Sequence, residues 1–176
     1  VQAIKWGIDQ GVDIISISAG SFFDFKPLHK ICKTAYEKNI LVIAAVGNSG
    51  SRYFDVAFPA RYPEVIGFAA YDKHHKVAKF SSRGVNVFCA APGTEMYSTW
   101  LDNSYCVSQG TSFSTPIISG ICALILAKHR LHKGNTPCET PSQMMEHLKK
   151  YSRRLDDGEN AVGFGTIDLP GMFKDD

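Results

Sequence analysis

Short apolar runs, separated by polar stretches that contain glycine, divide the first half of the chain. They lie at residues 12–18 (VDIISIS), 40–46 (ILVIAAV), 64–71 (EVIGFAAY) and 85–93 (VNVFCAAPG). Short continuous apolar runs rich in β-branched residues are typical of strands that are buried on both faces of a parallel sheet. The pattern therefore predicts four buried strands.

Apolar residues at helical spacing lie between and after these runs. The chain opens with an amphipathic segment that ends at Gly11, and residues 27–39 repeat apolar positions at helical intervals. Residues 114–132 form a long apolar helix with Pro116 expected in its first turn, and residues 140–151 form a last amphipathic helix. Strands that alternate with helices predict an α/β fold, a mostly parallel sheet flanked by helices, in one domain or part of one.

Composition and charge exclude several function classes. The chain has 176 residues, of which 44% are hydrophobic and 20% charged, as expected for an ordinary globular domain. The formal net charge of +2 is too small to indicate a nucleic-acid partner or a membrane surface. The longest apolar run, residues 117–127, is too short to span a bilayer, and no signal peptide opens the sequence. We therefore expect neither a nucleic-acid nor a membrane partner.

The five cysteines do not indicate a metal site. Their number is odd and their spacing matches no zinc-binding pattern. Cys89 and Cys122 stand in apolar runs and are interpreted as small core residues. A disulfide framework is the less favoured reading, and the cellular compartment is left open.

Two polar segments stand where a parallel sheet gathers its chemistry, at the carboxyl ends of strands and the amino ends of helices. Residues 47–50 (GNSG) follow a predicted strand, and residues 110–116 (GTSFSTP) precede the long apolar helix. Neither segment contains the G-x-S-x-G pattern of a nucleophile elbow, so that class of hydrolase is not favoured.

Each of these segments has a structural and a chemical interpretation. Ser112 can cap the helix, or it can present its hydroxyl to a carbonyl carbon while its N–H group faces the developing oxyanion. Asn48 can form a turn, or its amide can donate to that same oxyanion. Ser114 and Thr115 are the expected helix caps, because they lie nearer to Pro116.

Longer motifs carry a family resemblance. Residues 110–127 (GTSFSTPIISGICALILA) resemble the nucleophile segment of subtilisin-like serine peptidases, and residues 41–50 (LVIAAVGNSG) resemble the oxyanion-hole strand of that family. Residues 11–20 (GVDIISISAG) look like the strand that pairs with the substrate. Further similar segments follow in the order of the family, and the resemblance covers nearly the whole chain.

The resemblance implies a role for each matching residue. Ser112 would be the nucleophile, and Asn48 would form the oxyanion hole with the backbone N–H of Ser112. The residues implied in substrate binding are Ser18, Ala19, Gly20, Ala45, Val46, Gly47, Ala57 and Thr111. Within this set, residues 18–20 would lie along the substrate backbone, residues 45–47 would form the opposite wall of the pocket, and Ala57 would lie near its floor. Small uncharged walls favour an apolar or aromatic substrate side chain, and the resemblance implies a polypeptide as the partner.

The resemblance also bears on cofactors. No cofactor is required for the chemistry of the family. A structural calcium ion often accompanies it, and the loop carbonyls near Ala60, Tyr62 and Val65 are the candidate ligands. No acidic cluster in the sequence demands such an ion, so the presence of a metal is left open.

Two motifs of the family are absent from the sequence. The aspartate motif (Asp-Ser/Thr-Gly) does not occur, and none of the six histidines is followed by Gly-Thr. All six histidines are expected at the surface, and Asp9 and Asp13 are expected to be surface or cap residues. A serine without a base is a weak nucleophile. We therefore expect residues 1–176 to be the C-terminal portion of a subtilisin-like domain, with a sheet that is incomplete on its N-terminal side.

The partner that follows from this expectation is an upstream segment of the same protease, carrying the Asp and the His. The alternative is a non-catalytic pseudoprotease or a peptide-binding fragment.

Overall fold

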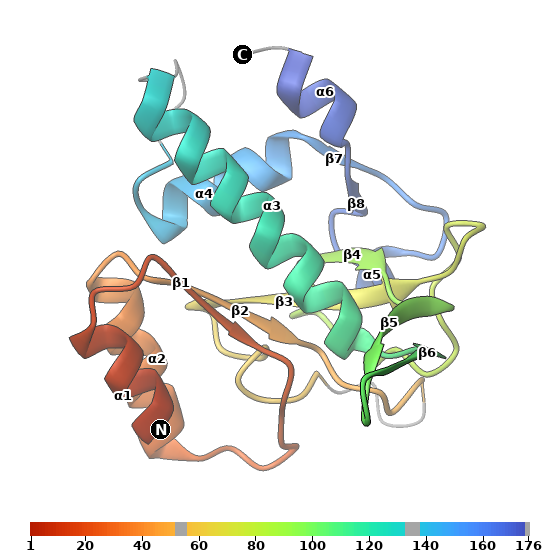
Figure 1. The fold of residues 1–176 in the computed structure, drawn as a ribbon, viewed down its shortest axis with the longest axis horizontal. Helices are drawn as coiled ribbons and strands as arrows, with labels where there is room; N and C mark the ends of the chain where they lie inside the picture. The colour runs from red at the N-terminus through yellow and green to blue at the C-terminus, as the bar shows by residue number, and fades with distance from the viewer. Residues whose placement is uncertain (52–55, 133–137, 175–176) are drawn as a thin grey trace.

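A six-stranded sheet forms the centre of the molecule (Figure 1). The computed structural model describes residues 1–51, 56–132 and 138–174. The strands of this sheet are β1 (Ile14–Ile17), β2 (Leu41–Ala45), β3 (Val65–Tyr71), β4 (Cys89–Pro92), β7 (Ser152–Arg153) and β8 (Thr166–Ile167). Their order is β1-β2-β3-β4-β8-β7; the first five in this order run parallel, and β7 is antiparallel to β8. The predicted α/β fold with a mostly parallel sheet is confirmed.

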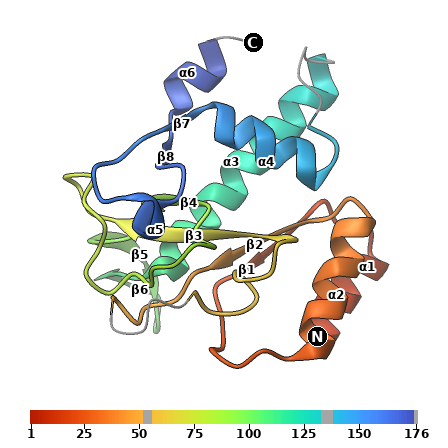
Figure 2. The same ribbon diagram turned by 180° about the vertical axis from the view of Figure 1, so that it is seen from behind.

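Helices cover both faces of this sheet (Figures 1 and 2). One face is covered by α1 (Gln2–Asp9), α2 (Lys26–Glu37) and the short α5 (Glu159–Val162). The other is covered by α3 (Thr111–His132), α4 (Pro141–Lys150) and α6 (Leu169–Lys174). Two hydrophobic layers therefore enclose the sheet, and α3 packs across β1, β2, β3 and β4.

The position of β2 between the two hydrophobic layers explains why its sequence is apolar at every position. Val42 and Ala44 point into the layer shared with α1 and α2, whereas Leu41 and Ile43 point into the layer under α3. All five residues of β2 are buried. Burying a valine, leucine or isoleucine side chain stabilises a fold by roughly 1.5–3 kcal/mol, so both faces favour large aliphatic residues.

The predicted strand at residues 85–93 is shorter in the structure, where β4 begins only at Cys89. The N–H of Val87 donates to the Gly84 carbonyl at 3.1 Å, and Val85 is 86% exposed. A turn with an exposed valine therefore precedes the strand, and an apolar run alone does not reveal it.

The pattern also missed a hairpin between β4 and α3. Strands β5 (Met96–Trp100) and β6 (Ser104–Ser108) are antiparallel, and Tyr97 stacks on Tyr105 with 5.3 Å between ring centroids. Asp102 and Asn103 connect them with φ values of +54° and +53°. Asp and Asn tolerate this left-handed backbone better than most residues, so the pair was the available sequence signal for the turn.

The predicted start of the long helix and its caps were wrong. α3 begins at Thr111, which places Pro116 inside the helix and not in its first turn. Ser114 Oγ donates to the carbonyls of Ala91 (3.1 Å) and Pro92 (3.0 Å), and Thr115 Oγ1 donates back to the Thr111 carbonyl (2.9 Å). Neither hydroxyl accepts from a free N–H of the first turn, so neither is a cap.

α3 is also longer than the apolar run in the sequence suggested. By length and composition alone, Thr111–Leu131 could cross a membrane, contrary to the expectation that no segment reaches that length. A core helix of a globular protein passes the same test, and α3 contacts four central strands. One side of α3 therefore packs on the sheet as a core helix does, and 39% of the apolar window is buried.

The predictions for the cysteines and for the histidines had different outcomes. No disulfide joins any of the five cysteines, all of which lie among the described residues, and Cys89 and Cys122 are buried as predicted. His147 is buried and packs against Tyr151, with 4.9 Å between ring centroids, so its predicted surface position was wrong. Its place on the inner side of α4, beside the buried Met144 and Leu148, explains this burial.

Candidate active site

Three segments that are distant in the sequence meet at one edge of the sheet. They are the chain after β1 (residues 18–20), the chain after β2 (residues 46–48) and the start of α3. The carboxyl ends of parallel strands share one edge of a sheet, which explains why these segments come together. Hydrogen bonds join Ser18 to Ser112 and Asn48 to Thr111. The structure thus brings the sequence candidates together.

Two hydrogen bonds orient the Asn48 side chain. The backbone N–H and the hydroxyl of Thr111 both donate to Asn48 Oδ1, each at 3.0 Å. Because a backbone N–H can only donate, it must face the oxygen of the amide, and this turns Nδ2 the other way. Thr111 is 1% exposed. Its hydroxyl therefore holds Asn48, a role that the sequence did not reveal when Thr111 was placed among the substrate contacts.

Gly110 leaves a small space beside two hydrogen-bond donors. A Cβ atom built on Gly110 would lie 3.3 Å from Asn48 Nδ2 and 3.7 Å from the backbone nitrogen of Ser112. Ser112 is the second residue of α3, where a backbone N–H has no intrahelical acceptor. Any side chain at position 110 would fill the space that both donors border, and the φ of +151° also favours glycine. Two nitrogen atoms that can donate hydrogen bonds therefore border this space.

The Ser112 side chain is half-buried and bonds to the chain after β1. Its Oγ donates to the Ser18 carbonyl at 3.3 Å, and Ser18 Oγ donates to the Ser112 carbonyl at 2.9 Å. In the part of the chain that the structure describes, the partner of the Ser112 hydroxyl is thus a backbone carbonyl, not a histidine or a carboxylate. A carbonyl holds the hydroxyl in place but is too weak a base to remove its proton.

Two other candidate substrate-binding residues, Gly20 and Gly47, lie against Ala57, which is buried. A Cβ atom on Gly20 would lie 3.0 Å from Ala57 Cβ, and one on Gly47 would lie 3.3 Å from the same atom. Phe22 Cζ would lie 3.6 Å from that Cβ on Gly47. Phe22 therefore lies beside the candidate wall, although the sequence analysis did not identify it.

The remaining candidates differ in exposure. Ser18, Ala19 and Gly20 are exposed, whereas the side chains of Ala45 and Val46 are buried. The first three are accessible to a ligand along their backbone. The latter two expose little surface, and the N–H and carbonyl of Val46 are already bonded to Phe68 and Ala57.

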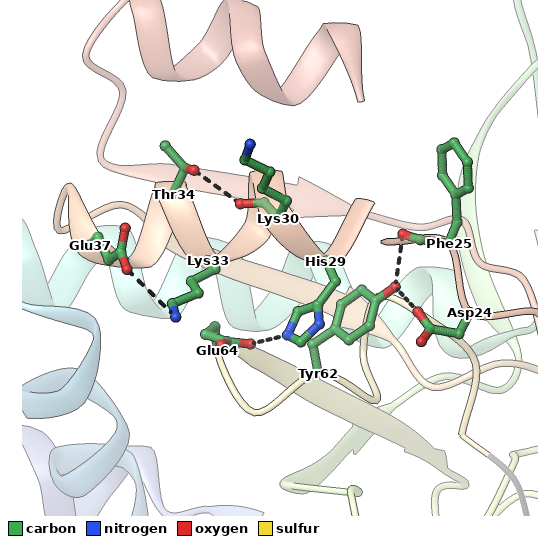
Figure 3. A network of polar contacts seen from close by, with 9 residues as sticks. All are labelled: Asp24, Phe25, His29, Lys30, Lys33, Thr34, Glu37, Tyr62 and Glu64. Carbon is green, nitrogen blue, oxygen red and sulfur yellow. Dashed lines mark hydrogen bonds and ion pairs between the residues drawn. The ribbon is translucent and has the colours of Figure 1, made fainter. Parts of the chain in front are cut away.

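A polar network holds Asp24 and Phe25, which follow the candidate substrate-binding residues 18–20 in the chain (Figure 3). The Tyr62 hydroxyl donates to Asp24 Oδ1 at 2.7 Å, and the His29 ring stacks on the Tyr62 ring at 4.2 Å between centroids. His29 Nε2 lies 3.1 Å from Glu64 Oε2. Burial, together with the hydrogen bond to Asp24, raises the pKa of Tyr62 to about 12, so Tyr62 stays a neutral donor at neutral pH. The network ties Asp24, Phe25 and α2 to the loop that leads into β3.

The loop carbonyls considered for calcium lie beside a cavity of about 670 Å³, which Ala60, Tyr62 and Val65 help to line. The charged side chains around it are Lys149, Arg154 and Glu159, and the last two are paired at 3.8 Å. Ca²⁺ favours about six to eight oxygen ligands with several carboxylates. No cluster of metal-ligating side chains occurs among the described residues, so a calcium ion held by the loop carbonyls stays a prediction.

Comparison with known proteins places this geometry in a family. The profile of the subtilase family, peptidase S8, matches residues 1–165. The chain is 36% identical to the minor extracellular protease Epr of Bacillus subtilis over 99% of its own length, and 35% identical to subtilisin DY of Bacillus licheniformis over 89%. It spans only 26% of Epr and 56% of subtilisin DY.

Solved structures agree with this relationship. The prenylagaramide maturation protease PagA superposes with a TM-score of 0.88 at 27% identity, over 98% of this chain and 65% of that one. The patellamide maturation protease PatA gives a TM-score of 0.84 at 29% identity, over 98% of this chain and 66% of that one. Taken with the match over residues 1–165, these similarities show that the chain belongs to the subtilase family of serine peptidases.

Proposed function

We propose that the protein containing this chain is a serine endopeptidase that cleaves peptide bonds through an acyl-enzyme at Ser112. Membership of the subtilase family supports the reaction class, for which no cofactor is needed. The observation that carries the assignment to Ser112 is the space beside Gly110, which is bordered by Asn48 Nδ2 and by the N–H of Ser112. A protein that only binds peptides needs neither these donors nor a serine beside them.

The proposed reaction has two halves. Ser112 Oγ bonds to the carbonyl carbon of the scissile peptide, its proton passes to a histidine base, and the carbonyl oxygen becomes an oxyanion held by the two N–H donors. The carbon–nitrogen bond then breaks, and the leaving amine takes the proton from the histidine. A water molecule attacks the acyl-enzyme in the same way, which releases the carboxylic acid and restores the Ser112 hydroxyl.

We propose that the histidine and its aspartate partner belong to a segment upstream of this chain, because neither family motif occurs in residues 1–176. Two features of the fold support a docking partner of this kind. β1 is an edge strand, and one side of α3 exposes Leu124 (61%) and Leu131 (77%) beside small exposed residues. An unpaired strand and an exposed apolar helix face both gain stability when they are covered.

The substrate in this proposal is an extended polypeptide. Its backbone would pair with residues 18–20 as an added strand, which satisfies the exposed polar groups of that segment. The side chain before the scissile bond would lie between this segment and residues 45–47, with Ala57 at the floor. These walls carry no charge, so we propose an apolar or aromatic preference at that substrate position.

Labelling with a fluorophosphonate tests the proposed activity. We expect the full-length protein to react at Ser112, because the reagent needs both an activated serine and an oxyanion hole. The measurement is mass spectrometry of the labelled peptide, with heat-denatured protein as the control. Failure of the natively folded full-length protein to label, while it still binds peptides, would favour the alternative of a pseudoprotease.

Asn48→Ala is expected to lower the rate constant for acylation by roughly a hundredfold or more, because one of the two oxyanion donors is lost. The Michaelis constant should change little, since the amide contacts the oxyanion mainly in the transition state. Stopped-flow acylation of the full-length protein with a p-nitrophenyl ester measures both quantities.

Thr111→Val is the matched comparison for this prediction. It keeps the Asn48 amide but removes one of the two bonds that orient it, so a smaller loss is expected. A change confined to the Michaelis constant in Asn48→Ala would contradict the proposed role and identify Asn48 as a turn residue or a ground-state contact.

A further inference from the structure

Pro116 interrupts the hydrogen-bond ladder of α3 at the residue that carries the candidate nucleophile. In an α-helix the N–H of residue 116 would donate to the carbonyl of residue 112, four positions earlier. Proline has no N–H, so the Ser112 carbonyl loses its helical partner. This carbonyl belongs to the same residue as the hydroxyl that is proposed to attack the substrate.

Ser18 supplies the missing donor. Its Oγ lies 2.9 Å from the Ser112 carbonyl oxygen and donates to it, although the two residues are 94 positions apart. The backbone carbonyl of Ser18 in turn accepts from Ser112 Oγ at 3.3 Å. A reciprocal pair of hydrogen bonds therefore joins the end of β1 to the first turn of α3, at the point where the helix lacks a bond of its own.

We propose that the Ser18 hydroxyl is a positioning residue for Ser112: it replaces the helical hydrogen bond that Pro116 removes and so fixes the backbone from which the nucleophile projects. The role depends on the side chain, and it is distinct from the expected pairing of the Ser18 backbone with substrate. The inference rests on the proposed peptidase function of Ser112.

A second bond farther along α3 supports this view of the β1–α3 contact. Ser119 Oγ donates to Ser16 Oγ at 2.8 Å and lies 2.9 Å from the Thr115 carbonyl. This bond joins the same strand to the same helix, but it does not involve a carbonyl freed by proline. Ser16 is therefore a matched control: it joins the same two elements without contacting the nucleophile.

A double-mutant cycle in the full-length protein tests the inference. Ser18→Ala is expected to lower kcat on a peptide p-nitroanilide about tenfold with little change in KM, because a displaced nucleophile affects the transition state more than substrate binding. Ser18→Thr keeps a hydroxyl and should restore most of the rate. Ser16→Ala should leave kcat within about twofold, because positioning of Ser112 does not depend on it.

The decisive arm is Pro116→Ala. Alanine returns an N–H group that can bond the Ser112 carbonyl, so Ser18→Ala should cost less than about twofold in that background. Two results would overturn the proposal. One is that Ser18→Ala lowers kcat equally with Pro116 and with Pro116→Ala, and the other is that it does not lower kcat when Pro116 is present. A wild-type protein that neither cleaves nor labels at Ser112 would instead contradict the proposed function itself, and thermal unfolding of each variant separates both results from a folding defect.

Discussion

Replacing Ser112 with alanine is expected to remove peptidase activity from the full-length protein while leaving its fold intact. Only the hydroxyl group is lost, and its hydrogen bond goes to the Ser18 carbonyl near the surface. The second bond of that pair uses the Ser112 backbone and survives the substitution. We expect kcat/KM to fall by at least about four orders of magnitude, because the covalent route is closed and only binding and the oxyanion donors remain.

Ser114→Ala is the control for this prediction. Ser114 lies two residues away in the first turns of α3, where it is fully buried, and its hydroxyl donates to the carbonyls of Ala91 and Pro92. Its removal should cost about 1 kcal/mol of stability and spare the activity. Near-normal turnover in Ser112→Ala, together with an inactive Ser114→Ala, would contradict the assignment of the nucleophile.

Residues 1–176 alone are expected to show no measurable peptidase activity and to be poorly stable. In the described part of the chain no base reaches Ser112, whose hydroxyl bonds to a backbone carbonyl. β1 lies at the edge of the sheet, and α3 exposes Leu124 and Leu131. An unpaired edge and uncovered apolar surface favour aggregation of the isolated chain.

Purified residues 1–176 should therefore be assayed on casein with and without the segment that precedes them in the full-length protein. Addition of that segment, covalently or as a separate chain, is expected to raise the melting temperature and to restore fluorophosphonate labelling. The full-length Ser112→Ala variant sets the background of the assay. Robust cleavage by the isolated chain that depends on Ser112 would show that one of its own histidines acts as the base.

The strands and the family could be predicted from the sequence because both depend on local, contiguous residues. β2 is apolar at every position because both of its faces are covered, and a short apolar run is the direct signature of that burial. The nucleophile and oxyanion segments are likewise short, and each keeps its own spacing. The match to the subtilase family over residues 1–165 confirms what these segments indicated.

The hairpin and the helix start were less accessible to sequence reasoning. β5 and β6 alternate exposed residues with partly buried ones, so no apolar run marks them. The proximity of Ser114 and Thr115 to Pro116 suggested capping, yet their hydroxyls donate to backbone carbonyls of other turns and strands. Capping depends on where the first free N–H groups point, which the spacing of residues does not specify.

The residue types of the candidate site, Asn48 next to Gly47 and Ser112 two residues after Gly110, were determined by the sequence alone. Only the tertiary structure decided how they are oriented. Thr111 turns the Asn48 amide, and Ser18 bonds the carbonyl that Pro116 leaves without a helical partner, across 94 positions of sequence. The physical reason is that a hydrogen bond depends on distance and direction in space, and for residues far apart in the chain only the packing of α3 on the sheet sets these quantities.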